Sequence, residues 1–303
     1  MSLAPFVHLL LALVCAPLLF SVINRTKAMI AGRDGQVLLQ PYYDLAKLLK
    51  KGAVYSGTTT WVFRAGPVVG LAALLVATAL VPFGGRAAPV AFAGDLILFA
   101  SLLGLLRFFT VIAALDTGSS FEGMGASREV TFSALAEPAL LLGLAAVARQ
   151  TGSLSLSTMY AGVDLDTWVV AAPVFALLAG ALLVVFLAEN ARIPVDDPTT
   201  HLELTMIHEV MVLDHGGPDL AFILYASALK LWLLGMLLVG LVVPVRTANP
   251  WLDGGAATAG MIGVAILTGI IESCMARWRL TRVPQLLVAA SVLSALALAL
   301  MLR

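Results

Sequence analysis

Charge is scarce in this chain of 303 residues. Only 12% of the residues are Asp, Glu, Lys or Arg, whereas 60% are hydrophobic. A soluble globular chain carries about a quarter charged residues, so this composition excludes an ordinary soluble domain. Basic and acidic residues both number 18, and the resulting net charge of zero provides no overall attraction for nucleic acid.

Cysteine is nearly absent as well. The chain contains Cys15 and Cys274 and no Cys-x-x-Cys pair, which argues against an iron–sulfur cluster or a thiolate zinc site. We expect both cysteines to be small apolar packing residues. The sequence also lacks a phosphate-binding loop, a dinucleotide-binding glycine pattern and a nucleophile elbow. We therefore expect no redox centre and no cofactor bound by this chain.

Long apolar runs are abundant instead. Eight of them approach or exceed the ~20 residues with which an α-helix crosses a bilayer. They cover residues 3–23, 65–82, 92–115, 131–148, 167–188, 220–243, 256–276 and 283–302. The sequence predicts an all-α, polytopic membrane protein that forms a single integral membrane domain over residues 1–303.

The basic residues predict the orientation of these spans. Loops after odd-numbered spans hold twelve of the eighteen Lys and Arg residues, and the opposite side holds four. Lys and Arg concentrate in cytoplasmic loops. An even number of spans also puts both termini on one side. We therefore expect an inner (cytoplasmic) membrane protein with both termini outside the cytoplasm.

The first predicted cytoplasmic loop contains a short amphipathic segment, residues 36–51. Pro41 suits a first helical turn, and three leucines then recur at helical spacing opposite Asp44 and three lysines. We expect a helix that lies on the membrane surface. The stretch 117–130, TGSSFEGMGASREV, is rich in Gly and Ser, and we expect it not to be helical throughout.

Several ionisable residues fall inside predicted spans, where they are costly and usually face a protein interior or a water-filled path. Arg107, Glu137 and Lys230 are the clearest cases. They could form a series of proton-exchanging groups. Alternatively, Arg107 and Lys230 could simply neutralise nearby acids. Asp95, at the end of the third span, is expected at a solvated interface.

The longest polar stretch is 189–220, ENARIPVDDPTTHLELTMIHEVMVLDHGGPDL. Pro194 and Pro198 interrupt the preceding helix, and Asp197 is placed to cap a new helix over about 198–213. Such a helix between two spans would carry polar side chains on more than one face. One face could contact a soluble partner, and the other could contact acids among the spans.

Histidines in this stretch invite a metal-site interpretation. His201 and His208 would share a helix face with Glu209 beside it, whereas Glu203 would point the opposite way. His208 and Glu209 begin a His-Glu-x-x-His zinc-protease pattern, but Val212 occupies the position of the second histidine. We therefore expect no metal site and interpret the histidines as groups at a protein interface.

Three loops carry a resemblance to a known family. The loop motif, which includes Glu189, Arg192, Pro194, Asp196, Pro198, Glu203 and Leu204, resembles the ENRxPFDxPExESEL pattern of the complex I subunit 1 family. Residues 200–214 are closer to the hydrogenase branch, the membrane subunits of formate hydrogenlyase and other group 4 nickel–iron hydrogenases. Residues 32–51 and the motif SREV, 127–130, resemble the same family.

The resemblance implies a docking and coupling role. Such a subunit binds a hydrogenase-like large subunit and an iron–sulfur small subunit, which carry the nickel–iron centre and iron–sulfur clusters. It couples electron transport there to the translocation of protons or sodium ions through neighbouring antiporter-like membrane subunits. Matching positions imply two groups of site residues. The proton-coupling or junction candidates are Glu189, Arg192, Asp196, Glu203, Glu129 and Glu137. The docking-face candidates are His201, His208, Glu209 and Asp214.

Two other functions remain open at this stage. The chain could be the quinone-site subunit of a respiratory complex I, although His201 stands where that branch usually has an acid. It could also be a proton-coupled secondary transporter, because acids within spans and an interrupted helix are typical of such proteins. No internal repeat supports the transporter.

Overall fold

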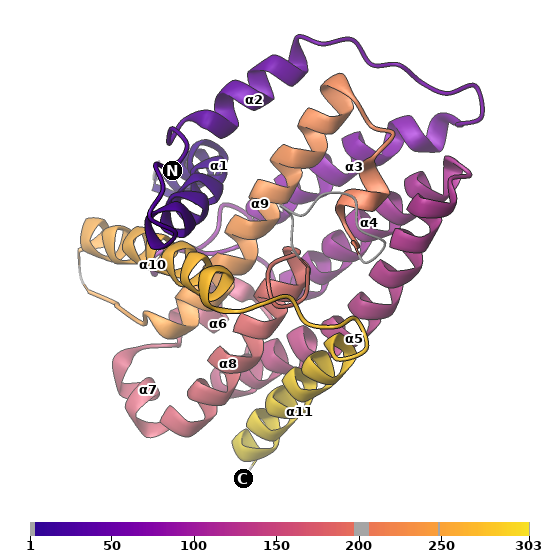
Figure 1. Ribbon diagram of the computed structural model, residues 1–303. Helices are drawn as coiled ribbons and strands as arrows, with labels where there is room; N and C mark the ends of the chain where they lie inside the picture. Colours follow the sequence, from indigo (N-terminus) through magenta and orange to yellow (C-terminus); the bar gives the residue numbers. More distant parts are fainter. Residues whose placement is uncertain (1–3, 197–205, 248, 303) are drawn as a thin grey trace.

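The computed structural model describes residues 4–196, 206–247 and 249–302 (Figure 1). Eight of its helices are long and apolar enough to cross a membrane. They are α1 (Ala4–Ile30), α3 (Trp61–Thr78), α4 (Asp95–Asp116), α5 (Ser120–Thr151), α8 (Ala172–Glu189), α9 (Gly217–Val242), α10 (Pro250–Cys274) and α11 (Val283–Met301). The predicted all-α polytopic fold is confirmed.

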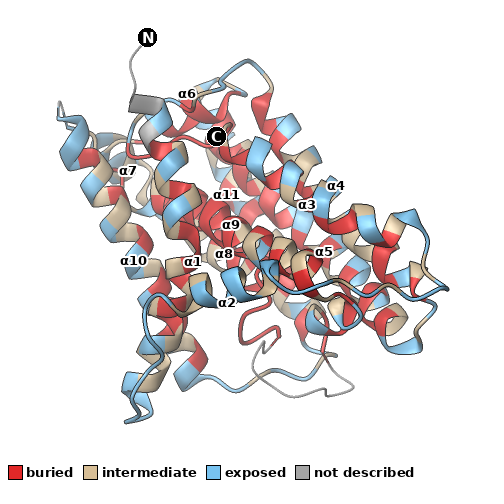
Figure 2. Cartoon of the chain, turned by 90° about the horizontal axis from the view of Figure 1, so that it is seen from above, coloured by how far each residue is buried: buried red, intermediate tan, exposed pale blue. Residues whose placement is uncertain are grey.

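Four short helices occupy the two ends of the bundle. They are α2 (Gln40–Leu49), α6 (Leu156–Ala161), α7 (Leu165–Val170) and the 3-10 helix η1 (Glu209–Val212). Both termini lie at the end that carries α6 and α7, and α2 lies at the other end (Figure 2). We call the latter the α2 end. The amphipathic helix predicted in 36–51 is confirmed as α2, none of whose residues is buried.

Helix α9 is the centre of the bundle. Its most apolar window is 67% buried, compared with 28% for α10 and α11. It packs against α1, α3, α8 and α10, with Trp232 almost fully enclosed. Gly240 permits close approach at one end, because a Cβ there would lie 2.6 Å from the Tyr160 ring. A central span with few lipid contacts can carry a polar residue such as Lys230 at lower cost.

The Gly- and Ser-rich stretch 117–130 is not helical at residues 117–119, as expected, but α5 begins already at Ser120, so the interpretation of the rest of the stretch as a loop is wrong. Its glycines allow close packing instead. A Cβ on Gly125 would lie 2.9 Å from both the Ile207 carbonyl oxygen and Val210 Cγ1. Small residues are therefore needed here because the segment around η1 lies directly against α5.

The predicted helix over 198–213 is corrected where the structure describes it. Residues 198–205 lie outside the described part of the chain, and 206–213 contain only the short helix η1. The Asp196 carboxylate accepts hydrogen bonds from the backbone N–H groups of Ile207 (3.1 Å) and His208 (3.4 Å). These amides bond to a side chain across the turn, and so do not join an α-helical ladder.

Asp95 also differs from expectation, because it is fully buried. Its carboxylate accepts hydrogen bonds from Ser155 Oγ (2.8 Å) and from the backbone N–H of Leu156 (2.6 Å). A buried carboxylate needs such donors to offset its lost hydration. Asp95 thus fixes the start of α6 against α4 and does not lie at a solvated interface.

Candidate functional site

Arg107 on α4 joins three carboxylates from two other helices. Its guanidinium contacts Glu129 (Nε–Oε1, 3.5 Å) and Glu137 of α5, and Glu189 at the end of α8 (Nη2–Oε1, 2.7 Å). The Glu189 side chain is only 5% exposed, whereas that of Glu137 is 47% exposed. One planar cation with several donors can therefore serve alternative acids in one place.

Lys230 extends this group into α9. Its ammonium nitrogen lies 2.8 Å from Glu189 Oε2, on the carboxylate oxygen that Arg107 does not contact. Glu189 therefore shares its charge between two cations from different helices. The interpretation that Arg107 and Lys230 neutralise nearby acids agrees with this geometry, and the same contacts place both cations in one connected group.

His208 extends the group toward the α2 end. Its Nε2 lies 3.2 Å from Glu129 Oε2, and its Nδ1 lies 3.9 Å from Asp196 Oδ2. The other oxygen of Asp196 pairs with Arg277 of the α10–α11 loop (Oδ1–Nη2, 2.9 Å). His208 was expected on a docking face, and the structure places it between two predicted coupling acids.

These contacts form one continuous series, which we call the central ion chain. Its members are Arg277, Asp196, His208, Glu129, Arg107, Glu137, Glu189 and Lys230. Glu129, Glu189 and His208, among others, line a small cavity. The centre of a water molecule can reach about 10 Å³ of it. Roughly 10–15 Å³ of such volume holds one water, so the space suits a single bridging molecule.

The environment of His208 favours its protonated form. Burial lowers the pKa of this imidazole, but the Glu129 charge and the interaction with Asp196 outweigh burial and the Lys230 charge. The pKa of His208 is therefore raised. Burial likewise raises the pKa of Asp196, but contacts with His208, Arg277 and the Ile207 N–H lower it overall. The two pKa values are therefore shifted in opposite directions, and each shift favours the charged form of its group.

Arg192 belongs to a second ion group, which we call the turn clamp. Its guanidinium pairs with Glu272 of α10 (Nη1–Oε1, 3.2 Å), and Lys27 of α1 pairs with the other oxygen of Glu272 (2.9 Å). The Arg192 guanidinium also lies over the Phe20 ring, 4.9 Å from its centroid. The clamp thus fixes the turn after α8 to α1 and α10.

Four predicted site residues remain, of which the structure describes two, Glu209 and Asp214. Glu209 and Asp214 are exposed at the α2 end, beside η1. The backbone N–H of Asp214 donates to Glu122 of α5 (3.1 Å), which holds this segment down. His201 and Glu203 lie outside the described residues, so their roles stay predictions.

Sequence reasoning did not assign a site role to Glu272 and Arg277. Glu272 is buried near the end of α10, and its charge within an apolar run was the available signal. Arg277 lies in a basic loop that topology alone explains, and no sequence pattern connects it to Asp196. Within the described residues, no group of three or more His, Cys, Asp or Glu could hold a metal ion.

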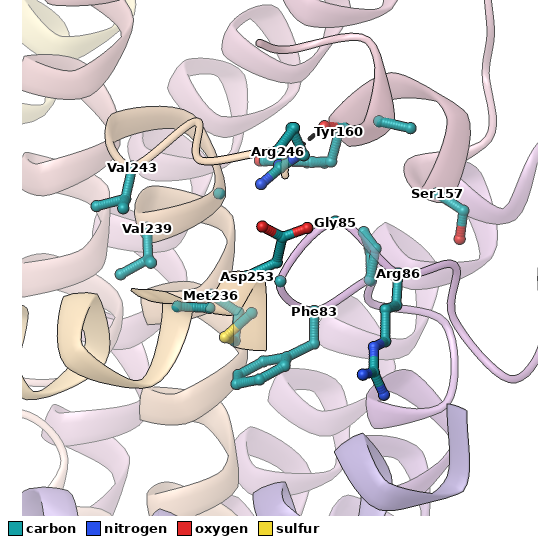
Figure 3. A pocket seen from close by; sticks show the side chains of 15 residues that line it. Phe83, Gly85, Arg86, Ser157, Tyr160, Met236, Val239, Val243, Arg246 and Asp253 are labelled. Atoms are coloured by element: carbon teal, nitrogen blue, oxygen red, sulfur yellow. Dashed lines mark hydrogen bonds between the residues drawn. The ribbon is translucent and has the colours of Figure 1, made fainter. Parts of the chain in front are cut away.

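A second hollow lies at the opposite end of the bundle (Figure 3). The centre of a water molecule can reach about 20 Å³ of it. Its lining includes Phe83, Tyr160, Arg246 and Asp253. Arg246 donates to the Tyr160 carbonyl oxygen (3.0 Å), and Asp253 accepts from the Thr247 N–H (2.8 Å). These bonds are used to hold loops together, so we place the candidate site at the central ion chain.

Known proteins are similar to this chain over most of its length. A family model described as NADH dehydrogenase matches residues 4–303. Formate hydrogenlyase subunit 4 of Escherichia coli K12 is 30% identical over 288 residues, which cover 93% of this chain and 92% of the relative. Hydrogenase-4 component C of the same organism is 30% identical, with coverage of 88% and 85%.

More distant similarity extends to other respiratory complexes. A subunit of the NADH-quinone oxidoreductase of Rubrobacter xylanophilus is 30% identical, but over only 55% of this chain and 51% of the relative. The solved structure of the membrane-bound sulfane sulfur reductase, an archaeal respiratory membrane complex, contains a chain with the same fold. It superposes with a TM-score of 0.82 at 19% identity and covers 99% of this chain and 98% of its own.

Proposed function

Because the chain belongs to the NADH dehydrogenase subunit 1 family, we propose that it anchors and couples a membrane-bound nickel–iron hydrogenase complex similar to formate hydrogenlyase. It is a multi-pass component of a membrane respiratory complex. The hydrogenase assignment is supported by similarity that spans most of the length of two hydrogenase-complex proteins. Similarity to quinone-linked relatives such as that of Rubrobacter covers about half the chain.

The proposed partners carry the redox chemistry. A hydrogenase-like large subunit would hold the nickel–iron centre, and an iron–sulfur small subunit would deliver electrons to it. Antiporter-like membrane subunits would lie beside this chain in the bilayer and move protons. In this arrangement the chain itself contributes side chains that position and exchange protons, and no electron carrier.

The α2 end is the proposed docking surface for the hydrophilic arm. The loops after odd-numbered spans, which lie at this end, hold most of the Lys and Arg residues. This supports the proposal that the α2 end faces the cytoplasm from the inner membrane. Glu209, Leu213 and Asp214 are exposed there, while Val210 and Met211 are buried beneath them. The segment around η1 packs against α5 and keeps an exposed outer face. It is therefore suited to bind a partner without a shift of the membrane-spanning helices.

The central ion chain is the observation that carries the coupling proposal. It connects this docking segment, through His208, to Lys230 in the most buried span. A change of charge at the docked arm would alter the pKa of His208, since nearby charges act strongly in a poorly hydrated site. A changed charge on His208 would alter the ion pair between Glu129 and Arg107. Through Arg107 it would alter the pairing of Glu189 with Lys230.

Charge counting identifies the protonation that matters. Among the described members, four carboxylates face three permanent cations: Glu129, Glu137, Glu189 and Asp196 against Arg107, Lys230 and Arg277. Counted over these described members alone, protonated His208 makes four positive and four negative charges, and neutral His208 makes three and four. Uptake and release of this proton would therefore switch the chain between balanced and unbalanced states.

Quinone reduction is the second candidate, since relatives from NADH-quinone oxidoreductases also match. The test is purification of the tagged chain with its partners from native membranes in mild detergent. The hydrogenase proposal predicts copurifying nickel and hydrogen formation. Flavin with quinone reductase activity and no nickel would favour the second candidate. An intact preparation with neither partners nor metal would contradict both.

A further inference from the structure

The loop between α10 and α11, residues 275–282, borders an open hollow at the α2 end. Its volume is about 370 Å³, and it is lined by Met275, Ala276, Arg277, Trp278, Arg279 and Arg282. Figure 1 shows this loop passing between the ends of the two helices in front of α8. Of its lining residues, Arg277 belongs to the central ion chain, whereas Arg279 and Arg282 have no part in the coupling or docking roles proposed above.

Two positive charges in the hollow are available to a ligand. Arg279 and Arg282 are exposed, and neither forms an ion pair with any residue that the structure describes. Arg277 differs because it already pairs with Asp196. Arg282 directly precedes α11, a helix of 19 residues. The N-terminus of this helix, with the positive end of the helix dipole, therefore lies beside the hollow. The hollow is therefore suited to an anion.

The position of the hollow favours a lipid as the source of that anion. The loop joins the ends of two membrane-spanning helices. Aliphatic side chains are exposed just beyond it on both, including Ile270 on α10 and Val288 on α11. Trp278 is partly exposed between the arginines. Tryptophan and arginine at a helix end are typical of the headgroup layer, where rings and guanidinium groups contact phosphates and chains together.

The two helices also have separate packing partners. α10 packs on α1 and α9, whereas α11 packs on α5 and α8. An acyl chain beneath the hollow could therefore contact both helices at once. A free phosphate ion would gain the charge contacts but none of this apolar contact.

We propose that this hollow binds the phosphate headgroup of an anionic phospholipid through Arg279 and Arg282, with the acyl chains against α10 and α11. The bound lipid would also stabilise the central ion chain. Arg277 of the loop pairs with Asp196, and the backbone N–H of Trp278 donates to the Pro194 carbonyl oxygen (3.0 Å). A headgroup that orders the loop would thus order the turn after α8.

The test compares lipid binding by the purified complex with and without the two arginines. Delipidated complex is titrated with phosphatidylglycerol in phosphatidylcholine vesicles, and bound lipid is counted by native mass spectrometry. The Arg279→Gln/Arg282→Gln variant should bind phosphatidylglycerol about tenfold more weakly than wild type, since each basic residue near the surface contributes appreciably. The Arg33→Gln/Arg149→Gln variant removes two exposed charges elsewhere and should bind like wild type.

A second measurement uses the wild-type complex alone. A photoreactive phosphatidylglycerol analogue should attach within residues 275–282, and excess inorganic phosphate should not displace it. Equal phosphatidylglycerol binding by both double variants would overturn the proposal, as would attachment only at other sites or ready displacement by phosphate. Attachment of an acidic partner peptide in place of lipid would also overturn it. None of these readouts depends on hydrogen formation or proton transfer.

Discussion

The central ion chain and the turn clamp both include a residue of the turn after α8, Asp196 and Arg192 respectively, yet they differ in composition. Among the described residues, the clamp places the Glu272 carboxylate between two cations, Arg192 and Lys27. It contains no histidine among the described residues. The chain contains more carboxylates than permanent cations, with His208 between two of them.

This difference separates a structural role from a switching role. A buried group of permanent charges resists change, because removal of any member leaves an unpaired charge. A group that includes histidine can gain or lose a proton near neutral pH at lower cost. We therefore interpret the clamp as the fixed support of the turn and the chain as its responsive part. The predictions below test that distinction, in order of decreasing effect.

Glu272→Ala should have the largest effect, on stability. It removes the Glu272 carboxylate from between the Arg192 guanidinium and the Lys27 ammonium, and breaking a buried ion pair costs about 3–5 kcal/mol. Denaturant unfolding of the purified protein measures the loss. Asp166→Ala removes an exposed acid of α7 and is the matched control. A loss no greater than that of the control would show that the clamp does not support the turn.

Gly125→Ala should separate His208 from the chain without a change of charge. The added Cβ would meet the Ile207 carbonyl oxygen at 2.9 Å and displace the segment that carries His208. Overpacking of this kind costs about 1–3 kcal/mol. Hydrogen formation and copurification of the hydrophilic arm should both fall. Gly104→Ala on α4 has open space and should change neither. Equal behaviour of the two variants would contradict the close packing.

Lys230→Met should weaken coupling while the complex stays assembled. Glu189 loses one of its two cations but keeps Arg107, so the fold retains its main contact. We expect about a tenfold loss of turnover, equivalent to roughly 1.4 kcal/mol. Lys230→Arg keeps the charge and should recover most of the activity. Wild-type turnover in Lys230→Met would exclude Lys230 from the coupled reaction.

The smallest expected effect is a pH dependence of stability. Because the pKa of His208 is raised in the fold, its contribution is fully present below the ordinary histidine pKa and is lost as pH rises through the raised value. The melting temperature of wild type should therefore fall over this neutral-to-alkaline window by a few degrees more than that of His208→Gln. Glu129, Asp196 and Lys230 are the charged groups that face this imidazole.

Asp196 provides an internal reference for that titration. Its pKa is lowered, so its contribution is present above the ordinary aspartate value and is lost only as pH falls through the lowered value. The two residues therefore act in separate pH windows. Parallel melting curves for wild type and His208→Gln on the alkaline side would contradict the assigned environment of His208.

Hydropathy is sufficient to predict the eight spans and helix α2, because membrane length and amphipathic spacing are local properties. The stretch 117–130 resembles a loop in sequence because Gly125 is required by contact with Ile207, which lies far away along the chain. Within 206–213, the described part of the helix predicted over 198–213, only η1 is helical, because Asp196 binds the amides of residues 207 and 208.

Part of the candidate site could likewise be predicted from the sequence, and part could not. Charges within apolar runs point to Arg107, Glu137 and Lys230 without knowledge of any contact. Which acid meets which cation depends on helix packing, so the sequence could not place Glu189 between Arg107 and Lys230. The inward position of His208 and its contact with Glu129 were also hidden, because they follow from the reversal of the chain at Asp196.

The most direct test of the coupling role is the number of protons transferred per hydrogen formed by the purified complex in sealed vesicles, for wild type and His208→Arg. Arginine keeps the chain balanced but cannot release its proton. We predict that His208→Arg assembles and forms hydrogen while transferring fewer protons per hydrogen than wild type. An unchanged ratio would contradict the claim that His208 switches the central ion chain.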